Sequence, residues 1–366
     1  MIRFLRHTHP EIVEEDERIV LRKAIHDQGC VMLSRTHFKP RRNVTIGTII
    51  SEGSMVPTSL KYESVLNSLH SFEALVGAEN VLILTEATSE CTEFTKSAGA
   101  FRCIDINICT LNRFGMPTMP CVLDTLMREA TTHDMVFVNS DILLFEDFLE
   151  SLDVAMSAEH YVMVGTRIDY LVERRLQSFD DYAKIRCDSF HFGSRNGEYA
   201  IDYFAFSSRR FPIFETGYIV GNWRWDNALL KRFYALEDIR VFDSSYAVIA
   251  VHQVSVLHEE QSARSERLAG MYNNDLAWAH DRDYTLGSIR FADYHLYRTK
   301  ATAVQIFGPS VPGKVVRCVL KSSGSGNPML SRDSMSLFMS FLEGKSAISK
   351  ASLEEHFRLD CPVRVF

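Results

Sequence analysis

Short apolar runs alternate with amphipathic stretches over about the first 170 residues of the chain. Apolar runs of about four to eight residues, rich in β-branched side chains, are typical of buried strands, whereas apolar positions three and four apart are typical of helices. The predicted strands are residues 43–50, 81–84, 101–106, 135–138 and 161–165. The predicted helices are residues 59–76, 120–130 and 148–156, so that no helix separates the second and third strands. This succession predicts an α/β fold in which a mainly parallel central sheet is flanked by helices.

Beyond about residue 170 the pattern changes, and polar and aromatic residues mix around two short apolar runs, 203–206 and 246–251. A helix is expected to begin near Trp225. The first residues are highly charged, with one helical stretch at 11–24. The last residues of the chain are expected to form a Ser/Gly-rich loop at 321–327 and an amphipathic helix at 334–357. We expect three parts: an N-terminal extension (1–42), one α/β domain (43–300) and a C-terminal extension (301–366).

Composition narrows the class of protein. The 366 residues are 46% hydrophobic and 24% charged, which is typical of a globular chain with enough apolar material for a core. The net charge of −7 argues against nucleic acid as the main partner, because phosphate binding needs a basic face. No run has the roughly 20 apolar residues of a membrane span, and the first residues have no apolar segment of signal-peptide length, so we expect a cytoplasmic protein.

The eight cysteines are scattered, and none forms a C-x-x-C pair. That spacing argues against a structural zinc site. Several cysteines fall within apolar runs, where a free thiol behaves as a small hydrophobic side chain. We therefore expect buried thiols, since an even count alone does not indicate disulfides.

A carboxylate follows the apolar run 135–138 directly, in the sequence Asn139-Ser140-Asp141. In open α/β sheets, ligands bind beyond the carboxyl ends of the strands. Asp141 there is suited to a divalent cation such as Mn²⁺ or Mg²⁺, which in turn binds a nucleotide diphosphate. The alternative is that Asp141 caps the helix that begins a few residues later.

A second cluster combines aromatic residues with carboxylates. Asp202 lies in the run Ile201–Phe206, and Asp226 stands in Trp223-Arg224-Trp225-Asp226-Asn227. Aromatic faces beside an acid are a common way to hold a sugar, because rings pack on C–H groups and the acid accepts from hydroxyls. The alternative is an aromatic core patch in which Asp226 caps a helix.

The apolar run 248–251 leads into His252, and His258 follows six residues later. A neutral imidazole at the end of a strand can ligate a metal, although a lone histidine is more often a hydrogen-bonding residue of the fold. Arg167, after the fifth predicted strand, and Arg113, in a turn-rich loop, can pair with a diphosphate or with the acceptor. Surface solvation is the alternative for both arginines.

Two of these segments resemble the GT-A-fold glycosyltransferases. Residues 111–117 and 136–142 are similar to the family pattern N-x-x-G-x-P followed by N-(A/S)-D-I. The resemblance implies a GT-A-like (Rossmann-like) domain in which Asn139, Ser140 and Asp141 occupy the D-x-D metal motif, with Asn in place of the first acid. Further donor contacts are implied for the residues after the first strand and in the Pro-containing loop, namely Ser51, Glu52, Asn112 and Arg113.

The later segments resemble the same family. Residues 202–206 and 221–227 are similar to D-x-F-x-F followed by G-x-x-x-W-D-N, and residues 252–258 match a His-rich element in part. The resemblance implies that Asp226 is the catalytic base, with Asp202 as the second candidate, and that Trp223 contacts the substrate. His252 and His258 are implied as further metal ligands.

These residues predict a metal-dependent, inverting glycosyltransferase. Its donor would be a nucleotide-diphosphate sugar and its acceptor a hydroxyl of a glycan, a glycoprotein or a small molecule. A sugar-nucleotide pyrophosphorylase is one alternative. Such an enzyme needs a Gly-rich, basic phosphate loop directly after the first strand, whereas residues 51–57 hold no basic residue and the next one is Lys61. The other is a non-catalytic carbohydrate-binding or interaction protein, which the replaced acid at Asn139 supports.

Overall fold

A computed structural model describes residues 40–41, 43–208, 217–221, 224–254, 264–280, 287–298 and 304–307. The helices expected at 11–24 and 334–357 and the loop expected at 321–327 lie outside these residues, as do Trp223 and His258. None of the described helices is long and apolar enough to cross a bilayer.

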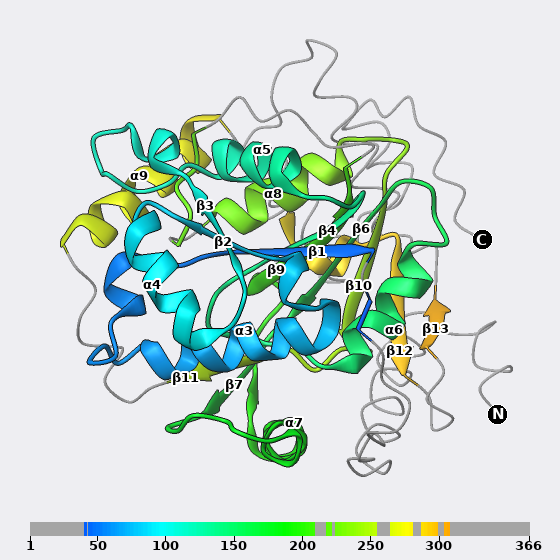
Figure 1. Cartoon of the computed structure of the whole chain (residues 1–366). Helices are drawn as coiled ribbons and strands as arrows, with labels where there is room; N and C mark the ends of the chain where they lie inside the picture. The colour runs from blue at the N-terminus through cyan, green and yellow to red at the C-terminus, as the bar shows by residue number, and fades with distance from the viewer. Residues whose placement is uncertain are drawn as a thin grey trace, which may run out of the picture.

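Nine of the described strands form a central sheet in the spatial order β13, β12, β10, β6, β9, β4, β1, β2, β3 (Figure 1). Five of the eight neighbouring pairs are parallel, and the three antiparallel pairs involve β9 or β13. The predicted α/β fold with a mostly parallel central sheet is therefore confirmed. The strands are β1 (Val44–Ile49), β2 (Val81–Thr85), β3 (Arg102–Asp105), β4 (Asp134–Val138), β6 (Tyr161–Thr166), β9 (Ile201–Ser207), β10 (Arg240–Tyr246), β12 (Tyr294–Arg298) and β13 (Val304–Phe307).

Helices cover both faces of this sheet (Figure 1). Leu82 and Leu84 of β2 pack into the core beneath α5 and α8, whereas Val81 and Ile83 pack into the core beneath α3, α4 and α6. Alternate side chains of a strand point to opposite faces, so a strand covered on both sides must be apolar throughout. The helices are α3 (Tyr62–Val76), α4 (Thr88–Ala98), α5 (Met119–Glu129), α6 (Glu146–Ala155), α7 (Phe179–Phe192), α8 (Trp225–Tyr234) and α9 (Arg264–His280).

Helix α4 corrects the prediction that the second and third strands follow each other directly. Only Cys91, Phe94 and Ala98 of its residues are buried, so its apolar stripe is too narrow to stand out in the sequence. Because α4 connects β2 to β3, those two strands are parallel neighbours joined by a crossover. The run expected at 246–251 is also interrupted, since β10 ends at Tyr246 and the next strand begins at Val251.

A second, four-stranded sheet lies at the carboxyl ends of β4 and β6. Its order is β5 (Ile142–Leu143), β11 (Val251–Val254), β7 (Ile168–Leu171) and β8 (Ser194–Arg195). Strand β11 pairs antiparallel with β5 and parallel with β7. Strand β5 follows β4 along the chain, and β7 follows β6. By pairing with both β5 and β7, β11 connects the segments that follow β4 and β6.

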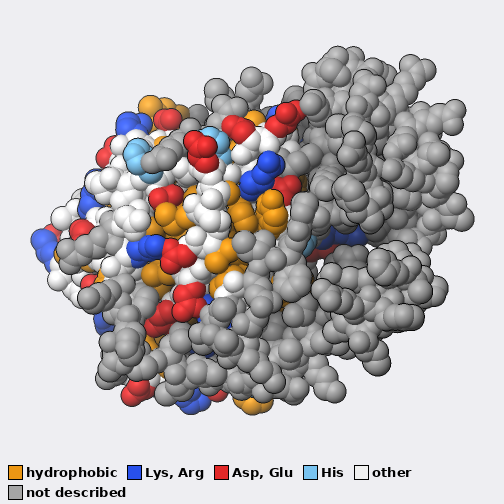
Figure 2. Space-filling model, turned by 90° about the vertical axis from the view of Figure 1, so that its right-hand side faces the viewer, with side chains coloured by type: hydrophobic (Ala, Val, Ile, Leu, Met, Phe, Trp, Pro, Cys, Tyr) orange, Lys and Arg blue, Asp and Glu red, His pale blue; other side chains and the backbone are white. Residues whose placement is uncertain are grey.

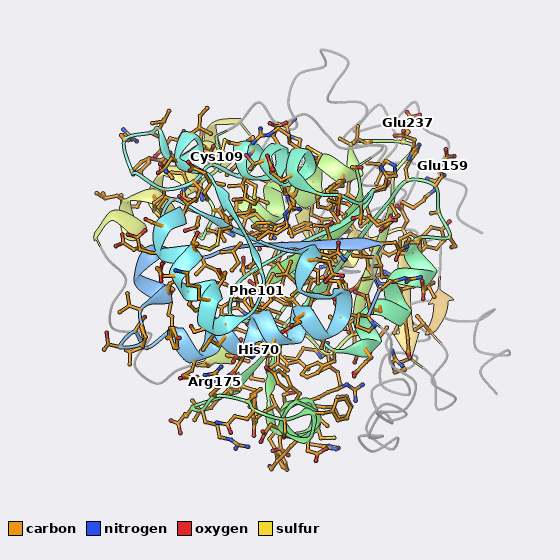
Figure 3. All side chains as sticks on the ribbon, in the orientation of Figure 1. His70, Phe101, Cys109, Glu159, Arg175 and Glu237 are labelled. Carbon is orange, nitrogen blue, oxygen red and sulfur yellow. A yellow bond between two sulfur atoms is a disulfide. The ribbon has the colours of Figure 1, made fainter. Side chains whose placement is uncertain are left out.

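Two disulfides correct the expectation of free thiols. Cys91 of α4 is bonded to Cys103 of β3, and Cys109 is bonded to Cys121 of α5. They lie on opposite faces of the sheet, with Cys109 beside α5 and the other pair in the core that holds Phe101 (Figure 3). Cys187 is disulfide-bonded as well. Each of the first two pairs is only 12 residues apart, and closing such a loop stabilises a fold by about 3 kcal/mol in the chain-entropy account.

Strand β13 lies beyond the expected domain boundary at residue 300. It pairs antiparallel with β12, from Val304 opposite Arg298 to Phe307 opposite His295. Residues 304–307 are therefore part of the central sheet.

On the described part of the face in Figure 2, acidic and basic side chains are interspersed rather than separated into fields of one sign.

Candidate functional site

Three neighbouring strands bring Asn139, Asp202 and Arg167 together at one edge of the sheet. Asn139 follows β4, Arg167 follows β6, and Asp202 is the second residue of β9, which lies antiparallel between them. Because Val138 is opposite Tyr203, the next residue of β4 comes level with Asp202, and the Asn139 N–H donates to the Asp202 carbonyl (3.0 Å). Residues that are 63 apart in the chain therefore meet through strand register alone.

The Asp202 carboxylate is occupied by these two neighbours. The Asn139 amide donates to Oδ1 at 2.6 Å, and Arg167 Nη1 lies 2.9 Å from Oδ2 and 3.1 Å from Oδ1. Only 7% of the Asp202 side chain is exposed. Burial raises the pKa of Asp202, although the Arg167 charge opposes this. Asp202 therefore holds Asn139 and Arg167 in place at the base of the site.

Asp141 faces His252, which the small sheet positions. His252 is opposite Asp169 in the pairing of β11 with β7, and its Nδ1 lies 2.8 Å from Asp169 Oδ1. His252 Nε2 lies 3.4 Å from Asp141 Oδ2. Burial lowers the pKa of His252, but the contact with Asp141 outweighs this and raises it, so a metal ion on Nε2 would have to displace a proton. Burial would raise the pKa of Asp141, but the contacts with His252, Lys61 and Arg167 lower it to about 2.

Asp141 and its neighbours suit a divalent cation whose remaining ligands come from a bound phosphate group and from water. A carboxylate, and an imidazole whose other nitrogen is held by a second carboxylate, form a common metal-binding arrangement. Among the described residues no group of three or more His, Cys, Asp or Glu side chains could enclose a metal. Asp141 and His252 could therefore supply two ligands, and Mg²⁺ or Mn²⁺ commonly completes such a shell with phosphate oxygens and water.

Asp141 opens onto a cavity of about 1000 Å³ at the carboxyl ends of β1, β4 and β6, whereas His252 lies behind Asp141 and does not line the cavity. The cavity is large enough for a nucleotide sugar, since ligand pockets span about 300–1000 Å³. The expected site residues that line it are Ser51, Asn139, Ser140, Asp141, Arg167, Asp202 and Asp226.

Three expected donor contacts lie away from the cavity wall. Glu52 is exposed in the short turn after β1. Asn112 shapes its own loop, because its amide donates to the Met116 carbonyl (2.7 Å) and accepts from the Phe114 N–H (3.0 Å). Arg113 lies over the rings of Phe114 and Tyr272. That loop nevertheless reaches the cavity through residues 115–117.

Asp226 lies in the first turn of α8 and lines the cavity beside Asp202. Its Oδ2 accepts from the Ile201 N–H at 3.4 Å. Burial raises the pKa of Asp226 to about 7, and the negative charge of Asp202 adds to this rise. A carboxyl group that titrates near neutral pH is suited to exchange a proton with a substrate hydroxyl.

The start of α8 is held in place by its neighbours. The Asn227 amide donates to the carbonyls of Tyr199 and Gly287 (3.3 Å each). A Cβ at Gly287 would stand 1.9 Å from the Asn227 carbonyl oxygen, so the close approach requires glycine. Trp225, which is 4% exposed, packs edge-on against Phe137 in the core and also lines the cavity.

Several residues in or beside the cavity could not be assigned from the sequence. Lys61 reaches the cavity from the residue before α3, close enough to help lower the pKa of Asp141. Glu86 follows β2, and Arg224 precedes α8 with a left-handed backbone (φ 79°). Asp169, which holds His252, stands two residues after Arg167. Position just after a strand was the available signal for Glu86, but it does not distinguish Glu86 from the other polar residues there, and Asp169 lies within β7.

We expect Asn139→Asp to destabilise the fold rather than to improve metal binding. The amide that now donates to Asp202 would become a second carboxylate against it, and breaking a buried pair of this kind costs about 1–3 kcal/mol. Chemical unfolding and Mn²⁺ titration of the variant measure the two effects. Asn139→Ala, which removes the amide without adding charge, is the control. Tighter Mn²⁺ binding with unchanged stability in Asn139→Asp would instead make residue 139 a metal position.

No family model and no curated protein matches the sequence. Several solved structures align with parts of the chain. Residues 1–349 of TarS from S. aureus, in complex with UDP-GlcNAc, align at 13% identity over 37% of each chain, with a TM-score of 0.24. The alignment thus spans little more than a third of that TarS chain.

Two other structures are covered almost completely by this chain. A 4-diphosphocytidyl-2C-methyl-D-erythritol synthase from Anaerococcus prevotii aligns at 10% identity over 63% of this chain and 99% of its own, with a TM-score of 0.33. A putative glucose-1-phosphate thymidylyltransferase from Bacillus anthracis aligns at 10% identity over 64% and 96%, with a TM-score of 0.32. Such slight likeness says nothing of the reaction, which has to be argued from the site.

Proposed function

We propose that this protein is a glycosyltransferase that moves a sugar from a nucleotide-diphosphate sugar to an acceptor hydroxyl with inversion. One observation supports the proposal: the cavity of about 1000 Å³ is lined both by Asp141, whose carboxylate contacts His252, and by the high-pKa carboxyl of Asp226. The first suits a metal-bound diphosphate, and the second suits a hydroxyl that must lose its proton.

In the proposed reaction Asp226 acts as the general base. Its carboxylate takes the proton of the acceptor hydroxyl while that oxygen bonds to the anomeric carbon. The bond from the anomeric carbon to the diphosphate oxygen breaks, and its electron pair leaves with the diphosphate. Attack from the face opposite the leaving group inverts the configuration.

Asp141 and His252 would hold a Mn²⁺ or Mg²⁺ ion, which acts as a Lewis acid toward the leaving diphosphate. Lys61 is the proposed second source of positive charge for the diphosphate, since it lines the cavity within electrostatic reach of Asp141. Arg167 is engaged by Asp202 and by Asp169, whose Oδ1 is 3.1 Å from Nε, so we assign it to positioning these carboxylates.

The disulfides bear on the compartment in which the protein works. A cytoplasmic location followed from the sequence, but disulfides persist mainly in oxidising compartments, because cytosolic thiols are kept reduced. With Cys91–Cys103 and Cys109–Cys121 on either side of the sheet, we propose an oxidising compartment instead.

A thermal-shift screen of sugar nucleotides, with and without Mn²⁺, tests the proposed function. We expect one sugar nucleotide to raise the melting temperature only when Mn²⁺ is present, because a ligand that binds the native state alone stabilises it. Transfer from that donor to hydroxyl acceptors is then assayed by release of the nucleoside diphosphate. If no sugar nucleotide shifts the melting temperature, the non-catalytic alternative is favoured.

A sugar-nucleotide pyrophosphorylase is the second candidate. Residues 51–57 hold no basic side chain, but Lys61 brings a positive charge to the cavity in their place. It would join a nucleoside triphosphate to a sugar phosphate and release pyrophosphate. Pyrophosphate release from such a mixture, without transfer from any sugar nucleotide, would favour this candidate.

A further inference from the structure

Exposed apolar side chains gather on two segments beside the cavity. Ile108 (70% exposed) and Leu111 (82%) lie in the loop before α5, and Leu268 (47%) and Met271 (58%) lie on α9. They are four of the eight most exposed large apolar side chains of the described residues. Leu268 and Met271 are three apart on α9, which places both side chains on the same side of the helix.

Aromatic contacts join the two segments into one surface. The rings of Phe114 and Tyr272 lie 5.0 Å apart, and the Arg113 guanidinium lies 4.7 Å and 5.4 Å from their centres. Figure 1 shows the loop before α5 and helix α9 side by side at the same end of the molecule. We call this surface the apolar rim, and its members are Ile108, Leu111, Phe114, Leu268, Met271 and Tyr272.

The apolar rim is rigid on its loop side. The disulfide Cys109–Cys121 ties the loop to α5, and the Thr118 N–H donates to the Cys109 carbonyl (3.0 Å). Exposed apolar side chains that are scattered singly need no explanation, but a fixed group of them indicates an interaction surface. None of the six lines the cavity, although residues 115–117 of the same loop do.

We propose that the apolar rim docks on a lipid bilayer that carries anionic headgroups. Leucine, isoleucine, methionine and aromatic side chains around a cation match the boundary between acyl chains and headgroups. Arg113 supplies the positive charge that complements a lipid phosphate or carboxylate, and it is fixed over both rings. Docking there would hold the cavity, whose wall includes residues 115–117, at the membrane surface.

Sedimentation with lipid vesicles tests the proposal. We expect the parent protein to pellet with vesicles of phosphatidylcholine mixed with phosphatidylserine, and less with phosphatidylcholine alone. The double variant Leu111→Asp/Met271→Asp should bind at least about tenfold more weakly, because two inserted apolar side chains become charged. Arg113→Gln should remove the preference for the anionic vesicles. Phe192→Asp is the matched control, since Phe192 is 79% exposed at the end of α7, outside the apolar rim.

Three outcomes would overturn the proposal: a parent protein that stays in the supernatant with both vesicle types, an equal loss of binding in Phe192→Asp, or a dimer in light scattering that Leu111→Asp/Met271→Asp dissolves. The last would make the apolar rim an interface between two copies of the chain. Melting temperatures of the variants show whether each has folded. The inference is independent of the reaction, because vesicle binding is measured without donor or acceptor.

Discussion

The variant Asp226→Asn is expected to lose sugar transfer by about a thousandfold while it still binds the donor. A positioned general base contributes about 10²–10⁴ to the rate of such a step, and an amide cannot take a proton from a hydroxyl. Asn keeps the size of the side chain, so the cavity and the Asp141–His252 pair should be unchanged. Initial rates of diphosphate release, together with donor titration followed by thermal shift, measure the two quantities.

The pH dependence of the parent should carry the signature of the same residue. Because the pKa of Asp226 is about 7, kcat/KM is expected to rise with pH through a midpoint near that value as the carboxylate forms. The residual rate of Asp226→Asn should lack this midpoint. A midpoint that persists in the variant would assign the titration, and with it the base, to another group.

Stability should change in the opposite direction to activity. The pKa of Asp226 is raised above the value of about 3.9 for an unfolded aspartate, so between the two values the folded state binds more protons than the unfolded state. Stability is therefore lost as the pH rises through this window, by at most about 4 kcal/mol. Asp226→Asn should be more stable than the parent at about pH 8 and similar to it at about pH 4. Asp124→Asn, an exposed change on α5, is the control and should show neither effect.

The sequence predicts those parts of the fold in which consecutive residues are buried, because they form an uninterrupted run of apolar or β-branched side chains. Strands β1, β2 and β4 are covered on both faces, so nearly every residue is buried and the runs of apolar or β-branched side chains are easily recognised. Helix α4 buries only three residues and α7 only two, so neither has a wide apolar stripe that the sequence would reveal. The disulfides were missed for a related reason: Cys91 and Cys103 meet only once the crossover from β2 to β3 has formed.

The candidate site could be predicted where strand ends converge. Asp141, Arg167 and Asp202 each stand at the end or start of a strand, and a sheet gathers such positions at one edge. What the sequence does not show is which neighbour each side chain meets. The Asn139 amide lies against Asp202, and Lys61 reaches across from α3, through register and helix placement that no local pattern records. The raised pKa of Asp226 likewise arises from burial that only the folded chain creates.

The second large effect is expected from Asp141→Asn, which should abolish the Mn²⁺-dependent part of donor binding and lower transfer by at least about a hundredfold. Asp141 is the only carboxylate paired with His252 Nε2, among the described residues, so its charge has no substitute. A hundredfold weaker donor complex would remove up to about 2.7 kcal/mol of ligand-induced stabilisation, which is measured as a smaller thermal shift at fixed donor and Mn²⁺ concentrations.

A graded series separates a role in metal binding from a role in folding. Asp169→Asn keeps the shape of the residue that holds His252 Nδ1 but weakens its hold, and outer partners of this kind are worth about 10–100-fold in metal affinity. Asp188→Asn, on α7 where the carboxylate pairs with Lys184, should leave Mn²⁺ affinity unchanged. If Mn²⁺ affinity falls in the order parent, Asp169→Asn, Asp141→Asn while melting temperatures without ligand stay close, the pair Asp141–His252 is the metal site. Equal Mn²⁺ affinity in all four proteins would place the metal elsewhere and leave His252 as a hydrogen-bonding residue of the small sheet.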